Sequence, residues 1–200
     1  MREGVSGIIL AGGSSRRMGR DKAFLPWGDT TLIEHLLERL KLVTDELIVA
    51  VKDARAFRHL KATVVEDCVP DAHALGGLYT GLRAACHERC FVCACDSPFL
   101  NPDLIRFLVE QVDGCDLVVP KTRQGLQPLH AIYATAALPT IEKQLHGRQR
   151  DLQALIPQVR AKIIEAGTIH RFDPDELSFF NVNTPQDLAQ ALAIQRRVSI

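Results

Sequence analysis

The chain of 200 residues lacks an excess of charge of either sign, because its 24 Lys and Arg residues balance its 24 Asp and Glu residues. Proteins that bind duplex nucleic acid usually carry a basic excess, so we expect no nucleic-acid partner. The chain also lacks an apolar run of membrane-spanning length. Its first residues, MREGVSGIIL, lack the long apolar stretch of a signal peptide. We therefore expect a cytoplasmic protein with no membrane partner.

Cysteine is present six times, but no pattern in the sequence calls for disulfides. Cys93 and Cys95 lie in the apolar run CFVCAC, and reduced thiols are the better interpretation without an export signal. Cys86, Cys90 and Cys93 have a C-x3-C-x2-C spacing that can bind an iron–sulfur cluster. Because Cys93 falls in a predicted buried strand, small core residues are the favoured interpretation of all three.

Apolar runs alternate with amphipathic segments between residues 6 and 120. We expect strands at 6–11, 46–51, 62–67, 90–95 and 116–120, and helices at 31–42, 54–61, 75–85 and 102–112. This alternation is typical of an α/β fold: a doubly wound, mostly parallel twisted sheet with helices on both faces. Ligands of such folds lie outside the carboxyl ends of the strands.

The alternation weakens after residue 120. A strand at 129–133, helices at 136–146 and 151–156, and a strand at 161–166 are expected. The last helix has a clear start, because Thr184 can cap it, Pro185 takes its first position and Asp187 can complete a capping box. No internal repeat or linker is present, so we expect a single domain over 1–200. No long apolar seam requires a second copy, and we expect a monomer.

The stretch LAGGSSRRMGRDK (10–22) follows directly on the first predicted strand. Gly12 and Gly13 allow positive φ angles and a close approach of backbone N–H groups to an anion. Arg17 and Lys22 can neutralise phosphates. A solvated surface turn is the alternative. The stretch fits neither the P-loop nor the G-x-G-x-x-G pattern.

The spaced motif L-A-G-G-x-S-x-R-M-G-x-x-K resembles the signature loop of nucleotidyltransferases that activate phosphorylated small molecules, in the form found in the MobA family, the molybdenum cofactor guanylyltransferases. Four further stretches are similar to this family in the same order: VVEDCVPD (64–71), CACDSPF (93–99), GLQPLHAIY (125–133) and FFNVNTPQDL (179–188). The chain departs from the family at His73-Ala74-Leu75, where Gly-Pro-Leu is common. It also lacks an asparagine in VAVKDAR, after the second predicted strand.

The resemblance implies a Rossmann-like nucleotidyltransferase that transfers GMP from GTP to the terminal phosphate of molybdopterin or the molybdenum cofactor. The nucleotide is expected in the part about 1–120 and the acceptor in the part about 121–200. The implied site residues are Leu10, Ala11, Gly12, Gly13, Lys22, Asp67 and Asp96 for GTP, Lys22, Asp96 and Arg17 for catalysis, and His130, Arg148, Asn181 and Asn183 for the acceptor. Mg²⁺ would be held by Asp96 with Asn183. Molybdoenzymes that receive the product are further implied partners.

Several alternatives stay open at this point. Asp67 can be a turn residue, Asp96 an N-cap, the two asparagines local backbone caps, His130 a core histidine and Arg148 part of a solvated loop. A cytidylyltransferase for the same cofactor, another small-molecule phosphate nucleotidyltransferase, and a nucleotide-binding subunit without turnover are the competing functions. Glycine rather than alanine at position 12 favours the larger purine, and hence GTP over CTP.

Overall fold

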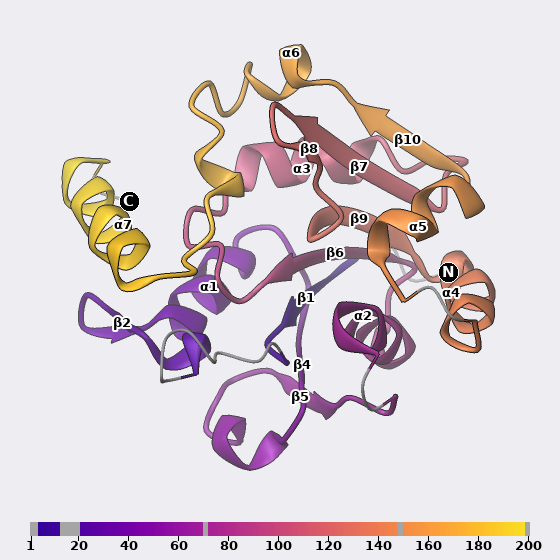
Figure 1. Ribbon diagram of the computed structural model, residues 1–200, viewed down its shortest axis with the longest axis horizontal. Helices are drawn as coiled ribbons and strands as arrows, with labels where there is room; N and C mark the ends of the chain where they lie inside the picture. The colour runs from indigo at the N-terminus through magenta and orange to yellow at the C-terminus, as the bar shows by residue number, and fades with distance from the viewer. Residues whose placement is uncertain (1–3, 13–20, 70–71, 148–149, 199–200) are drawn as a thin grey trace.

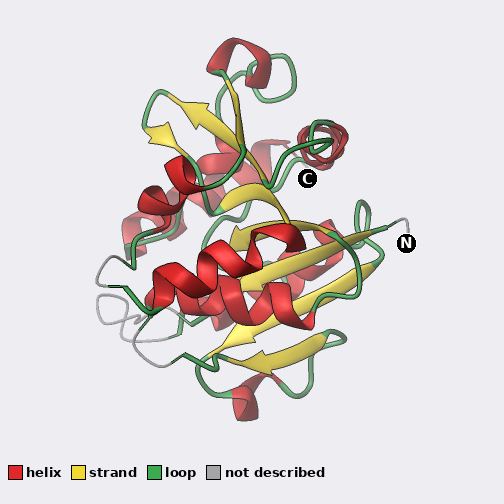
Figure 2. Ribbon diagram, turned by 90° about the vertical axis from the view of Figure 1, so that its right-hand side faces the viewer, coloured by secondary structure: helices red, strands yellow, loops and turns green. Residues whose placement is uncertain are grey.

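The computed structural model describes residues 4–12, 21–69, 72–147 and 150–198. One large sheet runs through the molecule with helices on both of its faces (Figures 1 and 2). Its strands are β1 (Val5–Leu10), β4 (Glu46–Val51), β5 (Thr63–Glu66), β6 (Arg89–Ala94), β7 (Leu117–Thr122), β8 (Gly125–Leu126), β9 (His130–Ala134) and β10 (Ala161–Ile164). The order across the sheet is β10-β7-β9-β6-β1-β4-β5, with β8 paired to β7. The predicted fold class is confirmed.

The first half of the sheet is parallel, as the sequence predicts. Strand β1 lies between β4 and β6 and is parallel to both, while β5 continues the sheet beyond β4. All six residues of β1 are buried, because both faces of this central strand are covered. The chain moves outward from β1 to β4 and β5 and then returns to pair β6 with the other side of β1, so strand order reverses at β1.

Strand β9 makes the second half of the sheet differ from the prediction. It is inserted between β6 and β7 and is antiparallel to both, so the strand at 116–120 does not extend the parallel sheet directly. The pairing places His130 opposite Cys93, near the carboxyl end of β6. The beginning of β9 therefore lies at the edge of the sheet where ligands are expected.

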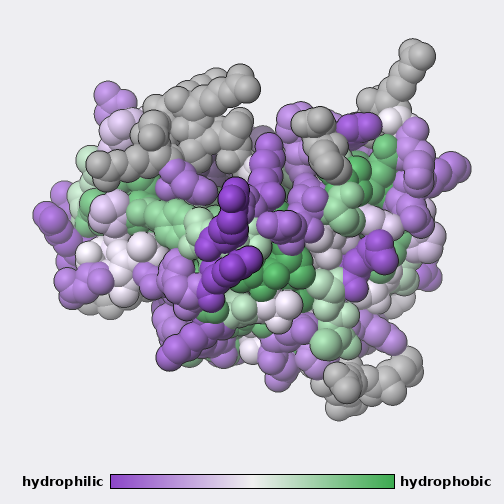
Figure 3. All heavy atoms as spheres, turned by 90° about the horizontal axis from the view of Figure 1, so that it is seen from below, coloured by the Kyte–Doolittle hydropathy of each residue, from purple (hydrophilic) through white to green (hydrophobic). Residues whose placement is uncertain are grey.

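The helices divide between the two faces. Helices α2 (His73–Ala84), α4 (Leu138–Leu145) and α5 (Leu152–Leu155) pack with the β1 face that carries Ile8 and Leu10. Helices α1 (Leu32–Leu40) and α3 (Pro102–Glu110) pack against the opposite face, and α7 (Pro185–Val198) adds Ala191 to the same core cluster. Helix α2 lies very close to β1. The distance at Gly81 shows this, since a Cβ placed there would be 2.6 Å from Ile8 Cγ2. Hydrophilic side chains cover much of the face shown in Figure 3, with hydrophobic areas between them.

Several local elements differ from the expectation. The helix predicted at 54–61 is a short 3-10 turn, η2 (Ala54–Phe57), and the strand predicted at 161–166 ends at residue 164 before α6 (Ala166–Ile169). The short ribbon of β2 (Pro26–Trp27) and β3 (Thr30–Thr31) was not predicted, nor were the single turns η1 (Lys22–Phe24), η3 (Thr135–Ala137), η4 (Ile156–Gln158) and η5 (Leu177–Phe179).

The cap of the last helix is confirmed. The Asp187 N–H donates to Thr184 Oγ1 at 3.2 Å, and the Asp187 carboxylate accepts from the Thr184 N–H at 2.8 Å. This box fixes the direction in which residues 181–184 enter α7. None of the described helices is long and apolar enough to cross a membrane.

Candidate active site

The carboxyl ends of β1, β4, β5 and β6 bring the predicted ligand residues to one edge of the sheet. Backbone bonding continues past the strand ends: Asp67 N–H donates to Val51 O at 2.7 Å, and Cys95 N–H donates to Leu10 O at 3.1 Å. Asp67 and Asp96 therefore leave the sheet at the same edge. Two cavities open there.

The first cavity, which we call the glycine-side cavity, has a volume of about 210 Å³. Its lining includes Leu10, Gly12, Asp67, His73, Gly77 and Asp96. It lies between the end of β1 and the beginning of α2. Apolar and backbone surface makes up much of this lining, as is usual for a small-molecule site.

The second cavity, the asparagine-side cavity, has a volume of about 270 Å³. Its lining includes Gln127, His130, Ser178, Phe179, Asn181 and Asn183. Asp96, together with Ala94 and Leu129, lines both cavities. The Asp96 carboxylate is therefore at the junction where two ligands could meet.

Lys22 connects three distant segments of the chain at this junction. Its Nζ donates to Asp96 Oδ2 and to Asn183 Oδ1, both at 2.7 Å. The Lys22 and Asp96 side chains are 18% and 19% exposed, so the pair is partly shielded from water. Lys22 begins the turn η1, which the Asp21 carboxylate caps by accepting from the Ala23 N–H. This cap determines where the lysine leaves the backbone.

The loop that carries Asp96 is held from several sides. The Val182 N–H donates to Asp96 O at 2.8 Å, and Ser97 Oγ donates to Asn181 Oδ1 at 2.8 Å. From α1, His35 Nε2 lies 2.9 Å from Pro98 O. Arg39, also on α1, donates to the Leu100 carbonyl. A carboxylate on a loop fixed in this way does not have to reorganise when it binds a ligand.

The oxygen atoms around Lys22 fit a magnesium ion. Asp96 Oδ2 and Asn183 Oδ1 already converge on one cation, the lysine ammonium. Both are hard oxygen donors of the kind that Mg²⁺ prefers, and Mg²⁺ usually takes one or two protein groups and completes its shell with water and substrate phosphates. Among the described residues there is no group of three or more His, Cys, Asp or Glu side chains that could enclose a metal ion by themselves.

Asp67 is a turn residue and a cavity residue at once. Its carboxylate accepts from the Val69 N–H at 3.0 Å and from Thr80 Oγ1 at 3.3 Å. A Cβ at Gly76 would lie 2.8 Å from Asp67 Oδ2. The absence of a side chain at position 76 therefore makes the room in which the carboxylate sits.

His73 has an unusual backbone conformation. Its φ angle is 51°, in the left-handed region that favours glycine, and it lines the glycine-side cavity. A non-glycine residue held in such a conformation is typical of functional sites.

Gly12 does not need its conformational freedom, contrary to the expectation from the sequence. Among the described residues, positive φ angles occur at other glycines and not at Gly12. A Cβ at Gly12 would meet Lys52 Cγ at 3.4 Å, which is an ordinary contact. What Gly12 contributes to the cavity is open space.

His130 and Ser178 have buried side-chain polar atoms. Both ring nitrogens of His130 and the hydroxyl oxygen of Ser178 have no hydrogen-bond partner among the described residues, and the residues are 2% and 1% exposed. Burial lowers the pKa of His130 from 6.5 to about 3, so the ring is neutral. A buried polar group left unpaired costs about 1–3 kcal/mol.

The cysteines do not form a ligand site. Burial raises the pKa of the Cys90 thiol to about 12 and also raises the pKa of Cys93, so both stay protonated. Cys86 is exposed at the other end of the strand. The interpretation as core residues fits Cys90 and Cys93.

The structure brings most of the predicted site residues together. Leu10, Gly12, Lys22, Asp67 and Asp96 surround the glycine-side cavity, and His130, Asn181, Asn183 and Asp96 surround the asparagine-side cavity. Ala11 is in the core at 5% exposure and lines neither cavity. Its N–H donates to Ala50 O within the sheet. Gly13, Arg17 and Arg148 lie outside the described residues. The sequence did not single out Ser178, Phe179, His35 or Arg39.

The molecule is an α/β protein with two cavities that meet at one carboxylate, at the point where the strand order of the sheet reverses. The sequence model of the MobA-like NTP transferase domain matches residues 7–162, and the chain belongs to this family.

Relatives support this membership over nearly the whole chain. A probable molybdenum cofactor guanylyltransferase of Pelotomaculum thermopropionicum is 37% identical over 187 residues, covering 94% of this chain and 91% of the relative. The molybdenum cofactor guanylyltransferase of Desulfosudis oleivorans is 34% identical over 96% of both chains. Among solved structures, the molybdopterin-guanine dinucleotide biosynthesis protein A of Archaeoglobus fulgidus superposes with a TM-score of 0.84 at 26% identity, covering 96% of this chain and 99% of that one.

Proposed function

We propose that this chain transfers the GMP group of GTP to the terminal phosphate of molybdopterin or of the molybdenum cofactor, with release of pyrophosphate. The observation that carries the proposal is the position of Asp96, which lines both cavities and binds Lys22. The names of the relatives supply the base and the acceptor.

GTP occupies the glycine-side cavity in this proposal. Leu10 and the backbone at Gly12 lie against the base and ribose, and Asp67 accepts from a donor on the nucleotide. The triphosphate extends from there toward Lys22, the cation at the junction. The basic residues at positions 13–20, including Arg17, follow directly in the sequence and would bind phosphates.

The reaction needs charge neutralisation rather than a protein nucleophile. An oxygen of the acceptor phosphate attacks the α-phosphorus of GTP, the bond from that phosphorus to the bridging oxygen of the β-phosphate breaks, and pyrophosphate leaves. Both reactants are anions, so fixed cations must offset their repulsion. Mg²⁺ would take the place of the Lys22 ammonium at Asp96 and Asn183, and Lys22 would then supply its positive charge to the phosphates directly.

The acceptor approaches from the asparagine-side cavity. Asn181 and Asn183 are two residues apart in an extended segment and line the same cavity, which supports a shared ligand. His130 lies deeper in the same cavity. Arg148, outside the described residues, remains a proposed contact to the acceptor.

Location and partners belong to the same proposal. None of the six cysteines forms a disulfide, as in proteins of a reducing compartment, and GTP is a cytoplasmic substrate, so we place the enzyme in the cytoplasm. A monomer that passes its product to molybdoenzymes completes the proposal.

Calorimetric titration with GTP, with and without Mg²⁺, followed by pyrophosphate release with purified molybdopterin, tests the function. We expect Mg²⁺-dependent binding and release of one pyrophosphate for each guanine dinucleotide formed. Binding without release would instead identify a nucleotide-binding subunit.

A further inference from the structure

His130 and Ser178 line the asparagine-side cavity, and three of their side-chain atoms, His130 Nδ1, His130 Nε2 and Ser178 Oγ, are buried with no partner among the described residues. They come from two segments distant in sequence, β9 and η5. Native proteins rarely leave buried polar atoms unpaired, and each such atom calls for an explanation. Because both residues line one cavity, a shared ligand explains all three atoms.

The segment that carries Ser178 is built to hold one conformation. The buried Asp173 carboxylate accepts from the Leu177 N–H at 3.0 Å and from the Ser178 N–H at 2.8 Å. Glu176 is held in the left-handed region at φ 54°, and its carboxylate lies 2.9 Å from His170 Nε2. Such strain persists where the surroundings fix the backbone and is concentrated at functional sites. The serine hydroxyl is thus presented at a fixed place.

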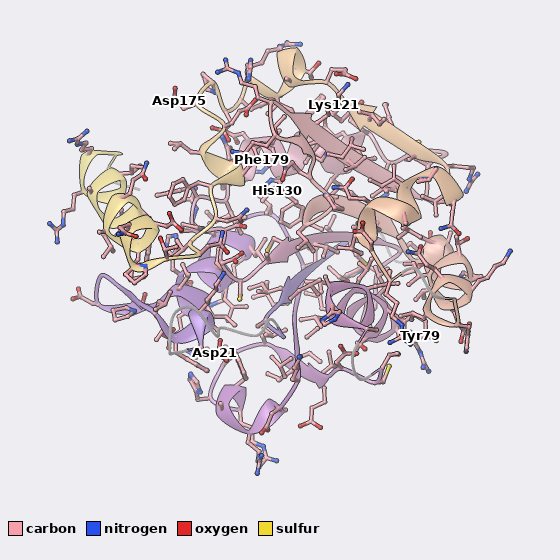
Figure 4. The ribbon with its side chains drawn as sticks, viewed as in Figure 1. Asp21, Tyr79, Lys121, His130, Asp175 and Phe179 are labelled. Atoms are coloured by element: carbon pink, nitrogen blue, oxygen red, sulfur yellow. The ribbon has the colours of Figure 1, made fainter. Side chains whose placement is uncertain are left out.

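The His130 ring is fixed between two aromatic side chains. Phe91 meets it edge-on with ring centroids 5.0 Å apart, and Phe179 lies 4.8 Å away at 55°. Figure 4 shows His130 beside Phe179, the residue that follows Ser178. A neutral ring held in this way offers one hydrogen-bond donor and one acceptor.

The charge of the cavity lining indicates what kind of ligand group can enter. Among the described residues that line it, none is Lys or Arg, and the one carboxylate, Asp96, is at the junction with the glycine-side cavity. The remaining polar groups are amides, hydroxyls and the imidazole. An anionic phosphate would find no compensating charge in this inner part, whereas a flat neutral heterocycle with its own donors and acceptors would find partners.

We propose that the inner part of the asparagine-side cavity binds the neutral heterocyclic end of the acceptor, with Ser178 Oγ and the His130 ring nitrogens as its hydrogen-bond partners. The acceptor phosphate then lies toward Asp96 and Lys22. This inference rests on the proposed function for the identity of the heterocycle, a pterin. It adds Ser178 as a recognition residue and sets the direction in which the acceptor lies.

The test uses 6-hydroxymethylpterin, a fluorescent neutral pterin without phosphate, titrated into the full-length chain. The variants are Ser178→Ala, which removes the hydroxyl, and His130→Phe, which keeps a ring between Phe91 and Phe179. The matched control is Ser6→Ala, since Ser6 is also buried but donates to Glu46 at 2.6 Å. The melting temperature and the KM for GTP are measured for every protein.

We expect each site variant to raise the dissociation constant of the pterin about tenfold, as for loss of one buried hydrogen bond, with an unchanged KM for GTP. Because the removed atoms have no partner in the free protein, the melting temperature should stay the same or rise. A structural role predicts the reverse, a lower melting temperature with unchanged pterin binding, and that result would overturn the inference. The inference would also be overturned if the wild type does not bind the pterin, or if the variants raise the KM for GTP instead of the dissociation constant of the pterin.

Failure of the proposed function gives a different result. If the wild type binds the pterin through Ser178 and His130 but forms no guanine dinucleotide from molybdopterin, the heterocycle site stands and the transfer reaction does not. If His130→Phe does not fold, Ser178→Ala decides alone.

Discussion

The two cavities satisfy their polar groups in different ways. In the glycine-side cavity the carboxylates already have partners, since Asp67 accepts from Val69 and Thr80 and Asp96 accepts from Lys22. In the asparagine-side cavity the buried side-chain polar atoms of His130 and Ser178 have no partner within the part of the chain that the structure describes. The first cavity therefore contains charged groups that are already hydrogen-bonded, whereas the second is lined by residues whose buried polar atoms can still form hydrogen bonds.

In the proposed reaction, this difference would let one edge of the sheet separate two ligands that both carry phosphate. Fixed charge gathers at the junction around Asp96, where the phosphates of both ligands would meet. The neutral parts of the ligands would lie on opposite sides, near the open backbone surface at Gly12 and near the buried polar atoms of His130 and Ser178.

The largest effect is expected at the residue that both cavities share. Asp96→Asn keeps the shape but removes the negative charge, so turnover should fall roughly a thousandfold, as for loss of an electrostatic group at the reacting centre. The melting temperature should change little, because a partly exposed ion pair contributes little stability. Initial rates over a range of Mg²⁺ concentrations measure this. Asp103→Asn, an exposed carboxylate on α3, is the control, and unchanged Mg²⁺-dependent turnover in the Asp96 variant would place the metal elsewhere.

Lys22→Met should separate the two ligands. It removes the ammonium but keeps the aliphatic stem, and one phosphate contact is worth about 1.5–3 kcal/mol, or roughly 10- to 100-fold in kcat/KM for GTP. The dissociation constant of 6-hydroxymethylpterin should not change. Lys143→Met, on the exposed face of α4, is the matched control. Equal loss of pterin binding would contradict the division of charge between the cavities.

Alanine substitutions at two neighbouring glycines of α2 should have different effects on stability and GTP binding. A Cβ at Gly76 would lie 2.8 and 2.9 Å from the two Asp67 carboxylate oxygens, whereas one at Gly77 would meet Leu10 Cδ2 at 3.5 Å. Gly76→Ala should therefore weaken GTP binding and lower the free energy of unfolding by about 1–3 kcal/mol. Gly77→Ala should preserve the fold. Urea unfolding and GTP titration measure both variants, and equal stability loss would show that Asp67 is not confined by position 76.

The last effect is the smallest at neutral pH, where it is absent, and it appears only in acid. The unfolded chain protonates its histidine near pH 6.5, but burial holds the pKa of His130 at about 3 in the folded protein. Stability from this residue is present above pH 6.5 and is lost as the pH falls toward 3, with a slope approaching about 1.4 kcal/mol per pH unit. His130→Phe should unfold with a shallower pH dependence in urea. His35, whose pKa is also lowered by burial, is common to both proteins. Parallel profiles would mean that His130 is not buried as a neutral ring.

The sequence predicts the parallel half of the sheet because each strand and helix there has its own local pattern. It does not predict that β9 inserts between β6 and β7, because an apolar run such as HAIYA shows a strand but neither its neighbours nor its direction. The segment 54–61 has helix-forming residues, yet the structure forms only η2 there. Local propensity gives way to the packing of this connection.

The charged site residues are predictable because spaced motifs mark them. Lys22, Asp96 and Asn183 each belong to a recognisable stretch, and their contact follows from the fold. Ser178 has no such signal, since it lies just outside the stretch 179–188. Its role depends on burial and on the lack of a partner, and both are properties of the folded chain.

Pyrophosphate release with purified molybdopterin and GTP, CTP, ATP or UTP, compared side by side, tests the central claim most directly. The glycine-side cavity has no side chain at Gly12, and a site that hydrogen-bonds one base edge rejects bases that leave its polar groups unpaired. We predict that GTP supports release and that CTP and ATP are poor donors. Preference for CTP would contradict guanylyl transfer and identify the protein as a cytidylyltransferase.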